Sequence, residues 1–496
     1  MTLDEIVGLL PDAVVDGEKL QTIRNIVCDS RQVTEGTLFI CLPGVKTDGH
    51  DYIGQAFQAG AVAAVVEREV QLPGNMTRIK VADTRKAMQA IVPYFFGFPG
   101  RKLRMIGVTG TNGKTTTTYL LRDILRCAGY KVGVIGTIQT LIAERVLPVK
   151  NTTPDVVELQ SILAQMVDAD IDYVVMEVSS HALALNRIAG CEFDVGIFTN
   201  MTQDHLDFHG TFENYLKAKA RLFQLLSSTD SLKAGKTAVV NLDDAAAGAI
   251  LQSSHCPTIT YAVKETAADL QAVRTDIRAS GSSITVQGPF GHLDIKLQIT
   301  GMFNVYNVLG AVGAALAEKV RPEIIQKALE QFKSVPGRFE LVDEGQPYSV
   351  IVDYAHTPDG LENILKTAQQ IAQRRIIVVF GCGGDRDRTK RPIMGGLAAE
   401  YGDVVLATSD NPRSEDPYAI LDEIEVGIKN KLQSDKIYEK IPDRRQAIKR
   451  ALELAQKDDI VVIAGKGHET YQILKDQTIH FDDREIARKY IREMIG

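Results

Sequence analysis

Short apolar runs that alternate with helical patterns restrict this chain to a small set of folds. The runs are residues 131–137, 173–180, 195–200, 237–244, 349–355, 376–384, 403–411 and 459–467. Each has the length and the valine and isoleucine content of a strand that is buried on both faces. Strands of this kind form parallel sheets whose faces are covered by helices, so the sequence predicts the α/β fold class.

The chain is too long to form a single domain. Its 496 residues exceed the roughly 250–300 residues at which one hydrophobic core stops growing. Two segments combine glycine, proline and aromatic residues in the manner of domain joints, residues 94–104 and residues 332–340. We therefore expect three domains, at residues 1–99, 100–334 and 335–496.

The composition disfavours several classes of partner. A formal net charge of −7 leaves no basic surplus for nonspecific binding of nucleic acid. The six cysteines are scattered without a CxxC pair, which is typical of reduced thiols in the cytoplasm. The longest apolar runs are too short for a membrane span, and the first residues carry acidic rather than basic side chains. We expect a cytoplasmic protein without a membrane span.

Residues 107–117 read GVTGTNGKTTT and follow an apolar strand pattern. Gly110 and Gly113 allow the backbone to turn tightly and to point its N–H groups at a phosphate. Lys114 adds a full positive charge, the helix N-terminus adds a partial one, and the Thr115 hydroxyl is a candidate magnesium ligand. The usual GxxxxGK[ST] motif has one more glycine, at a position where this chain has valine. The segment is therefore a variant phosphate-binding loop, because a merely flexible turn would not need its lysine and threonines.

Polar residues follow several strand patterns of the middle domain. Glu177 ends an apolar run, which is a natural place for a magnesium ligand. Residues 200–209 read NMTQDHLDFH, and this density of polar groups favours a functional role for His205, although a single histidine is more often structural. Tyr215 and Lys219 lie one helical turn apart on one face. From these residues alone, a solvated basic face is the simpler interpretation of that helix.

An ordered series of motifs along almost the whole chain resembles the Mur ligases, which build the peptide stem of bacterial peptidoglycan. The series begins at CDSRQVTEGTLFICLPG and continues with GTNGKTTT, EVSSHAL, TNMTQDHLDFHG, YLKAKARLF, TGMFNVYN, VPGRFE, DYAHTPD, GCGGDRDRTKRP, SDNPRSEDP and AGKGHE. The resemblance implies an N-terminal domain that binds the UDP-MurNAc part of a substrate. It also implies a central P-loop-type ATPase domain with a mostly parallel sheet and a C-terminal Rossmann-like domain that binds an amino acid.

Three segments resemble the corresponding segments of family members that share one activity. The DSR at residues 29–31, the NTTPD at 151–155 and the DNPR at 410–413 resemble members that act on UDP-N-acetylmuramoyl-L-alanyl-D-glutamate. The DNPR form resembles members that add meso-2,6-diaminopimelate, since lysine-adding relatives differ at the arginine. The resemblance implies an ATP-dependent amide ligase that forms an acyl phosphate and releases ADP and phosphate. It further implies Mg²⁺ as the cofactor and a chain that acts as a monomer.

The same resemblance implies roles for individual residues. ATP would be bound by Gly110, Thr111, Asn112, Gly113, Lys114, Thr115, Thr116, Asn304, Arg338 and Asp353. Magnesium would be held by Thr115, Glu177, His205 and Lys219, the last as a carbamylated lysine. The catalytic set would be Lys114, Glu177, His205 and Lys219. The muramoyl-dipeptide substrate would contact Ser30, Thr152, Thr153, Ser179 and Arg187. Diaminopimelate would contact Arg386, Asp410, Asn411, Pro412, Arg413, Gly465 and Glu469.

One position departs from the family pattern, and three other interpretations compete with the ligase. Leu185 stands where some members have a glutamine, which puts that substrate contact in doubt. Another amide ligase, such as a folylpolyglutamate synthetase, is disfavoured by the DSR and DNPR segments. A nucleotide-dependent switch would use ATP without needing both a UDP-sugar peptide and an amino acid. A Rossmann-type redox protein is disfavoured because the glycines at residues 381–384 do not give GxGxxG.

Overall fold

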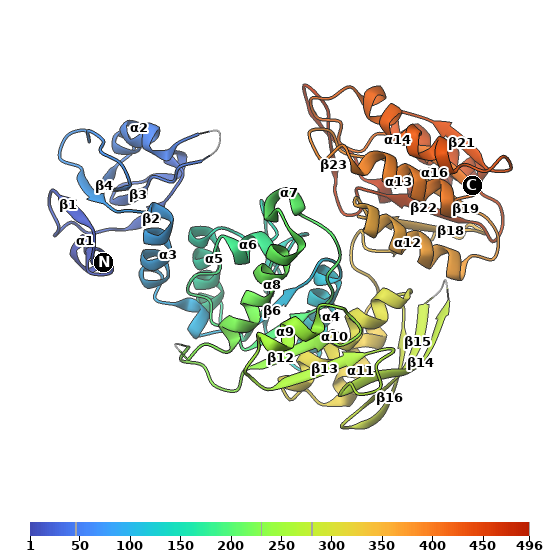
Figure 1. The fold of residues 1–496 in the computed structure, drawn as a ribbon, viewed down its shortest axis with the longest axis horizontal. Helices are drawn as coiled ribbons and strands as arrows, with labels where there is room; N and C mark the ends of the chain where they lie inside the picture. Colours follow the sequence, from blue (N-terminus) through green and yellow to red (C-terminus); the bar gives the residue numbers. More distant parts are fainter. Residues whose placement is uncertain (45–46, 230, 279–280, 496) are drawn as a thin grey trace.

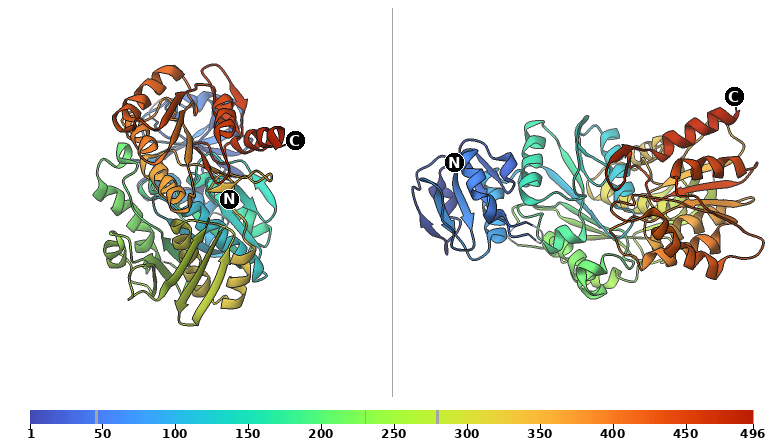
Figure 2. Two further views of the ribbon diagram at one scale, coloured as in Figure 1. Left: turned by 90° about the vertical axis from the view of Figure 1, so that its right-hand side faces the viewer. Right: turned by 90° about the horizontal axis from the view of Figure 1, so that it is seen from above.

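Three sheets divide the molecule into three domains (Figure 1). The computed structural model describes residues 1–44, 47–229, 231–278 and 281–495. Seen from above, the N-terminal, central and C-terminal domains follow one another along the molecule (Figure 2). Each of the three large sheets contains parallel strands covered by helices, so the predicted α/β class is confirmed.

The N-terminal domain has a five-stranded sheet in the order β1-β5-β4-β3-β2. All neighbouring pairs are parallel except the edge pair of β1 and β5. The strands are β1 Val14–Asp16, β2 Asn25–Val27, β3 Thr37–Ile40, β4 Ala61–Val66 and β5 Thr77–Lys80. The helices are α1 Leu3–Val7, α2 Ile53–Gln58 and α3 Thr84–Phe95, with short 3-10 turns at η1 Ser30–Gln32, η2 Gly49–Tyr52 and η3 Pro99–Arg101.

The central domain has an eleven-stranded sheet in the order β16-β15-β14-β13-β12-β11-β6-β10-β7-β8-β9. The strands are β6 Arg104–Thr109, β7 Val132–Ile135, β8 Thr140–Ile142, β9 Arg145–Leu147, β10 Tyr173–Glu177, β11 Val195–Phe198, β12 Thr237–Asn241, β13 Thr258–Ala262, β14 Leu270–Arg278, β15 Gly281–Gly288 and β16 Gly291–Leu297. The helices are α4 Lys114–Cys127, α5 Val156–Asp168, α6 Ser180–Ala184, α7 Leu206–His209, α8 Phe212–Leu226, α9 Ala247–Gln252, α10 Met302–Ala317 and α11 Pro322–Gln331.

Buried aliphatic side chains cover both faces of the central sheet. One core lies under α4, α10 and α11, and a second lies under α5, α8 and α9. Strands β7, β10, β6, β11, β12, β13 and β14 run parallel, while antiparallel pairs extend the sheet at both edges. Because parallel strands end at the same edge of a sheet, this arrangement places Thr109, Glu177 and Phe198 side by side.

The C-terminal domain has a six-stranded sheet in the order β17-β18-β22-β19-β20-β21 and a separate hairpin of β23 and β24. Only β17 runs antiparallel to its neighbour in the larger sheet. The strands are β17 Glu340–Leu341, β18 Ser349–Asp353, β19 Ile376–Phe380, β20 Val404–Ala407, β21 Ile437–Lys440, β22 Ile460–Ala464, β23 Tyr471–Ile473 and β24 Thr478–His480. The helices are α12 Pro358–Ile371, α13 Lys390–Tyr401, α14 Pro417–Lys431, α15 Arg444–Leu454 and α16 Asp483–Ile495.

All eight apolar runs that predicted strands contain one, and every one of those strands has a parallel neighbour. The chain leaves the first sheet through α3 and the second through α11, next to the two expected joints. The exact boundaries at 99/100 and 334/335 stay predictions.

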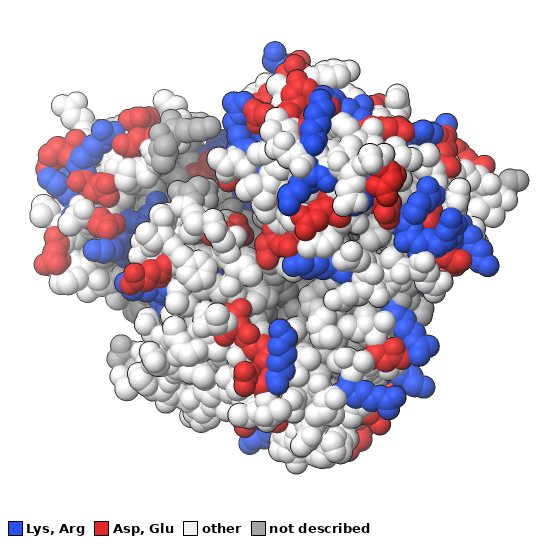
Figure 3. Space-filling model, turned by 45° about the vertical axis from the view of Figure 1, so that its right-hand side comes forward, with Lys and Arg blue, Asp and Glu red and all other residues white. Residues whose placement is uncertain are grey.

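Basic and acidic side chains are interspersed over the face drawn in Figure 3. Among the helices in the described ranges, none has the length and apolar character needed to cross a bilayer.

Candidate active site

The glycine-rich loop joins β6 to α4, which begins at Lys114. Gly110 (φ +153) and Gly113 (φ +85) adopt conformations that other residues rarely reach. A Cβ atom at these positions would also clash with Thr199 Oγ1 and Asn307 Oδ1. Lys114 Nζ donates hydrogen bonds to the carbonyls of Gly110 (2.9 Å) and Thr111 (2.8 Å). The ammonium therefore lies over the loop, where the prediction of a phosphate cradle requires it.

Glu177 lies at the end of β10 and is 1% exposed. Its Oε2 accepts hydrogen bonds from Thr115 Oγ1 (3.1 Å) and Thr137 Oγ1 (3.0 Å), and its Oε1 accepts one from Thr137 N (2.9 Å). The carboxylate thus meets the hydroxyl that follows Lys114 in the phosphate loop. Oxygen donors of these two kinds are the ligands that Mg²⁺ prefers, so Thr115 and Glu177 fit the predicted metal site.

A cavity of about 450 Å³ opens between the central and C-terminal domains. The phosphate loop forms one wall of this cavity, and Glu177, Asp204 and His205 also line it. The C-terminal domain contributes Arg338, Asp353, Tyr354, Ala355, His356, Thr357, Gly360, Asn363 and Ile364. Residues that lie far apart in the sequence therefore surround one space that is suited to a nucleotide.

Arg338 carries positive charge from the C-terminal domain to the phosphate loop. Its Nη2 donates to Thr115 Oγ1 (3.4 Å), and its guanidinium lies over the ring of Tyr354, 4.6 Å from the centroid. Its Nε is buried and has no hydrogen-bond partner within the described part of the chain. Asp353 accepts hydrogen bonds from the backbone N–H groups of Phe339 and Ala355, both at 2.7 Å. Asp353 thereby fixes the turn that presents Arg338.

A second contact between the two domains involves Asp359 at the start of α12. Its Oδ2 accepts hydrogen bonds from Asn112 Nδ2 (2.5 Å) and Thr202 Oγ1 (3.0 Å). Asn112 is also held by its own domain, because its backbone N–H donates a hydrogen bond to Asn200 Oδ1 at 2.9 Å. The C-terminal domain is therefore bonded directly to the phosphate loop in this conformation.

Lys219 is 1% exposed on α8, so the interpretation of its helix face as a solvated basic face is wrong. The lysine packs against Tyr215, whose ring centroid is 4.4 Å from Nζ and whose hydroxyl lies 3.0 Å from Thr111 Oγ1. No hydrogen bond or ion pair joins Nζ to any residue that the structure describes. Burial, reinforced by the charge of Lys114, holds the pKa of Lys219 well below its usual range.

His205 precedes α7 with a left-handed backbone (φ +53), and its side chain is 45% exposed. Its Nε2 lies 3.3 Å from Asp204 Oδ2, and its ring stacks edge-on against His181. Lys219 lies near the site but does not line the cavity. In the described ranges, no three His, Cys, Asp or Glu side chains are arranged as a metal site. The Thr115 and Glu177 pair is therefore the part of the predicted magnesium set that the structure brings together.

The residues expected to contact the muramoyl-dipeptide substrate fall into two groups. Thr152 and Ser179 line the cavity. Thr153 is buried behind them, where its hydroxyl donates to the carbonyl of Glu177 (2.8 Å) and accepts from the N–H of Ser179 (3.0 Å). Arg187 donates to the carbonyl of Thr153 at 3.4 Å.

Ser30 lies apart from these residues, in the N-terminal domain, where it donates to Gln55 Oε1 at 2.9 Å. The backbone carbonyl of Leu185, in the central domain, accepts a hydrogen bond from Gln89 Nε2 of the N-terminal domain at 3.0 Å. The position that departs from the family pattern thus takes part in an interdomain contact through its backbone.

Four residues expected to contact diaminopimelate gather around the ends of β20 and β22. Asn411 Nδ2 donates to Glu469 Oε2 at 2.9 Å. Gly465 lies against the Asp410 carboxylate, which a Cβ atom at position 465 would approach to 2.7 Å. The fully buried Lys466 donates to both Asn411 Oδ1 (3.1 Å) and Glu469 Oε2 (3.0 Å). The polar groups of this cluster are therefore held in fixed orientations.

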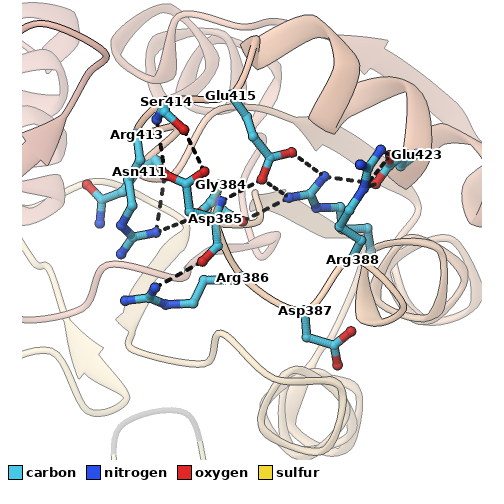
Figure 4. Close-up of polar contacts among 12 residues, drawn as sticks. Gly384, Asp385, Arg386, Asp387, Arg388, Asn411, Arg413, Ser414, Glu415 and Glu423 are labelled. Atoms are coloured by element: carbon cyan, nitrogen blue, oxygen red, sulfur yellow. Dashed lines mark hydrogen bonds and ion pairs between the residues drawn. The ribbon is translucent and has the colours of Figure 1, made fainter. Parts of the chain in front are cut away.

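The two arginines expected at this pocket lie on neighbouring loops (Figure 4). Arg413 Nη1 donates to the carbonyl of Gly384 at 2.8 Å, and Arg386 Nη1 donates to the carbonyl of Asp385 at 3.0 Å. Figure 4 shows both guanidinium groups on the side of the loop where Asn411 lies. Neither forms an ion pair with a described residue, so the alternative of a surface salt bridge for Arg413 is wrong. Pro412 is buried between the arginine and Asn411.

Sequence reasoning named Asn304 but missed Asn307, one helical turn later. Asn307 lines the cavity, whereas Asn304 is buried behind it and accepts a hydrogen bond from Asn307 Nδ2 at 3.0 Å. The sequence motifs also gave no role to Thr137, which orients Glu177, or to Lys466, which orients the amino-acid pocket. The GMFNVYN motif carries a signal for Asn307, because residues three apart share a helix face.

Comparisons with known proteins agree with this geometry. Family models match the Mur ligase family catalytic domain over residues 22–95, the Mur ligase middle domain over 108–315 and the Mur ligase glutamate ligase domain over 337–467. A relative from Geobacillus thermodenitrificans is 48% identical over 493 residues, which cover 99% of this chain and 100% of the relative. It is named UDP-N-acetylmuramoyl-L-alanyl-D-glutamate--2,6-diaminopimelate ligase. The chain belongs to the Mur ligase family.

Two further comparisons support this placement. A relative of the same name from Syntrophomonas wolfei is 46% identical over 492 residues, which cover 99% of each chain. A solved structure titled with that same ligase name is 33% identical to this Mur ligase, with a TM-score of 0.69. The matched region covers 100% of this chain and 99% of the solved chain. The likeness to the Mur ligases therefore extends through all three domains.

Proposed function

We propose that this Mur ligase adds meso-2,6-diaminopimelate to UDP-N-acetylmuramoyl-L-alanyl-D-glutamate, with conversion of ATP to ADP and phosphate. The product serves peptidoglycan precursor synthesis, and the free cysteines and the use of ATP support a cytoplasmic location. The observation that carries the proposal is a continuous series of contacts that connects the phosphate loop to the amino-acid pocket. Tyr354 packs on Arg338, which reaches the phosphate loop, and its ring lies 4.9 Å from that of His468, next to Glu469.

The first half of the reaction brings two anions together. The D-glutamate γ-carboxylate must attack the γ-phosphate of ATP to give an acyl phosphate and ADP. Lys114 and Arg338 carry positive charge to the phosphate loop, where they offset the repulsion between the anions and stabilise charge that develops in the transition state. Magnesium, held by the adjoining Thr115 and Glu177 and further by His205, which lines the same cavity, would add positive charge when it is bound.

The second half joins the amine of the incoming amino acid to the activated carbonyl, and phosphate leaves. Asn411 and Glu469 can bind an amino group of the incoming amino acid, since carboxylate and amide oxygens accept hydrogen bonds from an ammonium group. Asp359 and Arg338 bond the C-terminal domain to the phosphate loop. Such closure excludes water, which would otherwise hydrolyse the acyl phosphate.

We also propose that Lys219 is carbamylated. A buried ammonium beside the positive charge of Lys114 is electrostatically unfavourable, because the negative charges of Asp204 and Asp244 do not outweigh the cost of burial. A carbamate would place a negative charge there and would supply oxygen donors of the kind that magnesium prefers. The low pKa supports the modification, because only the neutral amine reacts with carbon dioxide.

A phosphate-release assay tests the proposed function. Purified protein, ATP, Mg²⁺ and UDP-N-acetylmuramoyl-L-alanyl-D-glutamate would be combined with meso-diaminopimelate, L-lysine, L-ornithine or no amino acid. We expect phosphate release to require both the UDP-sugar peptide and an amino acid, with the highest kcat/KM for meso-diaminopimelate. Phosphate release that needs neither substrate would indicate a nucleotide-dependent switch, and a preference for L-lysine would overturn the assigned amino acid.

Replacement of Arg413 by glutamine tests how the amino acid is distinguished. Lysine and meso-diaminopimelate differ at their far end by one carboxylate, which a guanidinium can bind with two parallel charge-assisted hydrogen bonds. Loss of such a pair should lower kcat/KM for meso-diaminopimelate by roughly 10- to 100-fold. The value for L-lysine should change little. Equal losses for both amino acids would contradict this role of Arg413.

A further inference from the structure

Two loops of the C-terminal domain are fastened together by reciprocal hydrogen bonds (Figure 4). One follows β19 and contains Gly384 and Asp385, and the other follows β20 and contains Asn411 and Arg413. Gly384 N donates to the carbonyl of Asn411 at 2.9 Å, and Arg413 Nη1 donates back to the carbonyl of Gly384 at 2.8 Å. A Cβ atom at position 384 would clash with the carbonyl of Pro412, so this close approach requires glycine.

One residue further along each loop, Asp385 and Ser414 form a second set of hydrogen bonds between the loops. Its Oδ1 accepts a hydrogen bond from Ser414 Oγ (2.6 Å), and its Oδ2 accepts one from Ser414 N (3.2 Å). Its own N–H donates to Glu415 Oε1 at 2.5 Å. The hydrogen bonds from Ser414 hold the pKa of the Asp385 carboxyl below its usual range, so the group is an ionised acceptor at neutral pH.

Both loops carry backbone strain at the residues that this fastening joins. Arg413 (φ +53) and Asp385 (φ +54) adopt left-handed conformations, which are unfavourable for residues other than glycine, although Asp and Asn tolerate them best. Such a conformation persists only where neighbouring contacts hold it. The two bonds to Ser414 act on the residue directly after Arg413, so they oppose relaxation of its backbone.

An ion-pair network centred on the buried Arg391 supports these loop contacts. Arg391 of α13 is fully buried and donates to both carboxylate oxygens of Glu415 (2.8 and 2.9 Å) and to Glu423 Oε2 of α14 (2.8 Å). Glu415 is the residue that accepts from Asp385 N. The loop that carries Arg413 is therefore anchored to two helices, and its position cannot change without breaking this network.

We infer that Asp385 is a positioning residue that holds Arg413 in place for the distal carboxylate of the incoming amino acid. This inference rests on the proposed function. Without the bonds to Ser414, Arg413 would sample other backbone and side-chain conformations, and binding of the amino acid would have to select one of them. The reacting amine lies at the opposite end of the amino acid, so the loss should appear in KM for meso-diaminopimelate rather than in kcat.

The test compares Asp385→Asn with the matched control Asp387→Asn. Asparagine tolerates the left-handed backbone but cannot accept both hydrogen bonds from Ser414. Asp387 lies in the same loop, is exposed, and accepts hydrogen bonds only from Thr389 among the described residues. Figure 4 shows its side chain pointing away from Arg413. The control thus removes an equal charge from the same loop without touching the fastening.

For Asp385→Asn we expect KM for meso-diaminopimelate to rise roughly tenfold and kcat to change less than about twofold. The preference for meso-diaminopimelate over L-lysine should fall by the same roughly tenfold factor, while KM for ATP stays constant. Ser414→Ala should act in the same direction, and the double variant should be less impaired than the sum of the two single effects. Asp387→Asn should match the unmodified protein.

Three results would overturn the inference. If Asp385→Asn matches Asp387→Asn while the unmodified protein uses meso-diaminopimelate, the inference fails and the proposed function stands. An equal loss with both amino acids, in kcat as well as KM and with a lower melting temperature, would show a purely structural role. If the unmodified protein releases no phosphate with meso-diaminopimelate, the proposed function fails, and the inference fails with it.

Discussion

Replacement of Lys219 by methionine should lower kcat by about 100- to 1000-fold, the range seen when a preorganised charged group is removed from an active site. The free energy of unfolding should stay constant or rise, because Lys219 is 1% exposed and its Nζ has no polar partner among the described residues. Methionine keeps the length of the side chain and removes a charge that is costly to bury. Kinetics and urea denaturation would measure the two effects separately.

Lys217→Ala is the matched control on the same helix. Lys217 is 69% exposed and forms a surface ion pair with Glu213, so its loss should change stability by at most about 1 kcal/mol and leave kcat unchanged. Lys219→Ala leaves space for a small acid, and added formate or acetate should restore part of its activity if a carbamate is the working group. Full activity of Lys219→Met would contradict both the carbamate and the role of Lys219.

Lys114→Ala should lower kcat/KM by about 1000-fold or more, because it removes the full positive charge of the phosphate loop. The side chain makes hydrogen bonds only to the carbonyls of Gly110 and Thr111 among the described residues, so the fold does not depend on it. Steady-state phosphate release and direct titration with ATP would show whether chemistry or binding is lost.

Lys102→Ala serves as the control for this change. Lys102 is exposed two residues before β6, where loss of its charge should leave both kcat and KM for ATP unchanged. An active Lys114→Ala protein that binds ATP normally would remove the basis for assigning phosphoryl transfer to this loop.

Local sequence patterns predicted the strands because their physics is local. A strand that is buried on both faces must be apolar throughout, as Val174, Val175 and Met176 of β10 are, and this property can be read without knowing its neighbours. The phosphate loop was predictable for a similar reason. Gly110 and Gly113 are required by backbone conformation, and Lys114 follows at a position set by the start of a helix.

Lys219 shows where local patterns fail. Helical periodicity placed it on one face with Tyr215, but periodicity does not say whether water or protein covers that face. In the structure, α8 packs on the core beneath β11 and β12, and Tyr215 reaches the phosphate loop. A lysine that appeared solvated is therefore buried, and its pKa is lowered by contacts that the sequence does not show.

The sequence by itself determined the α/β class, the eight parallel strands and the phosphate loop, because each depends on residues that are close together in the chain. Tertiary structure alone decided that Asn411 meets Glu469, that Arg338 reaches Thr115 and that Asp385 holds Ser414. These partners are separated by about 30 to 220 residues of sequence. Only the packing of sheets and the closure of one domain on another brings such groups together.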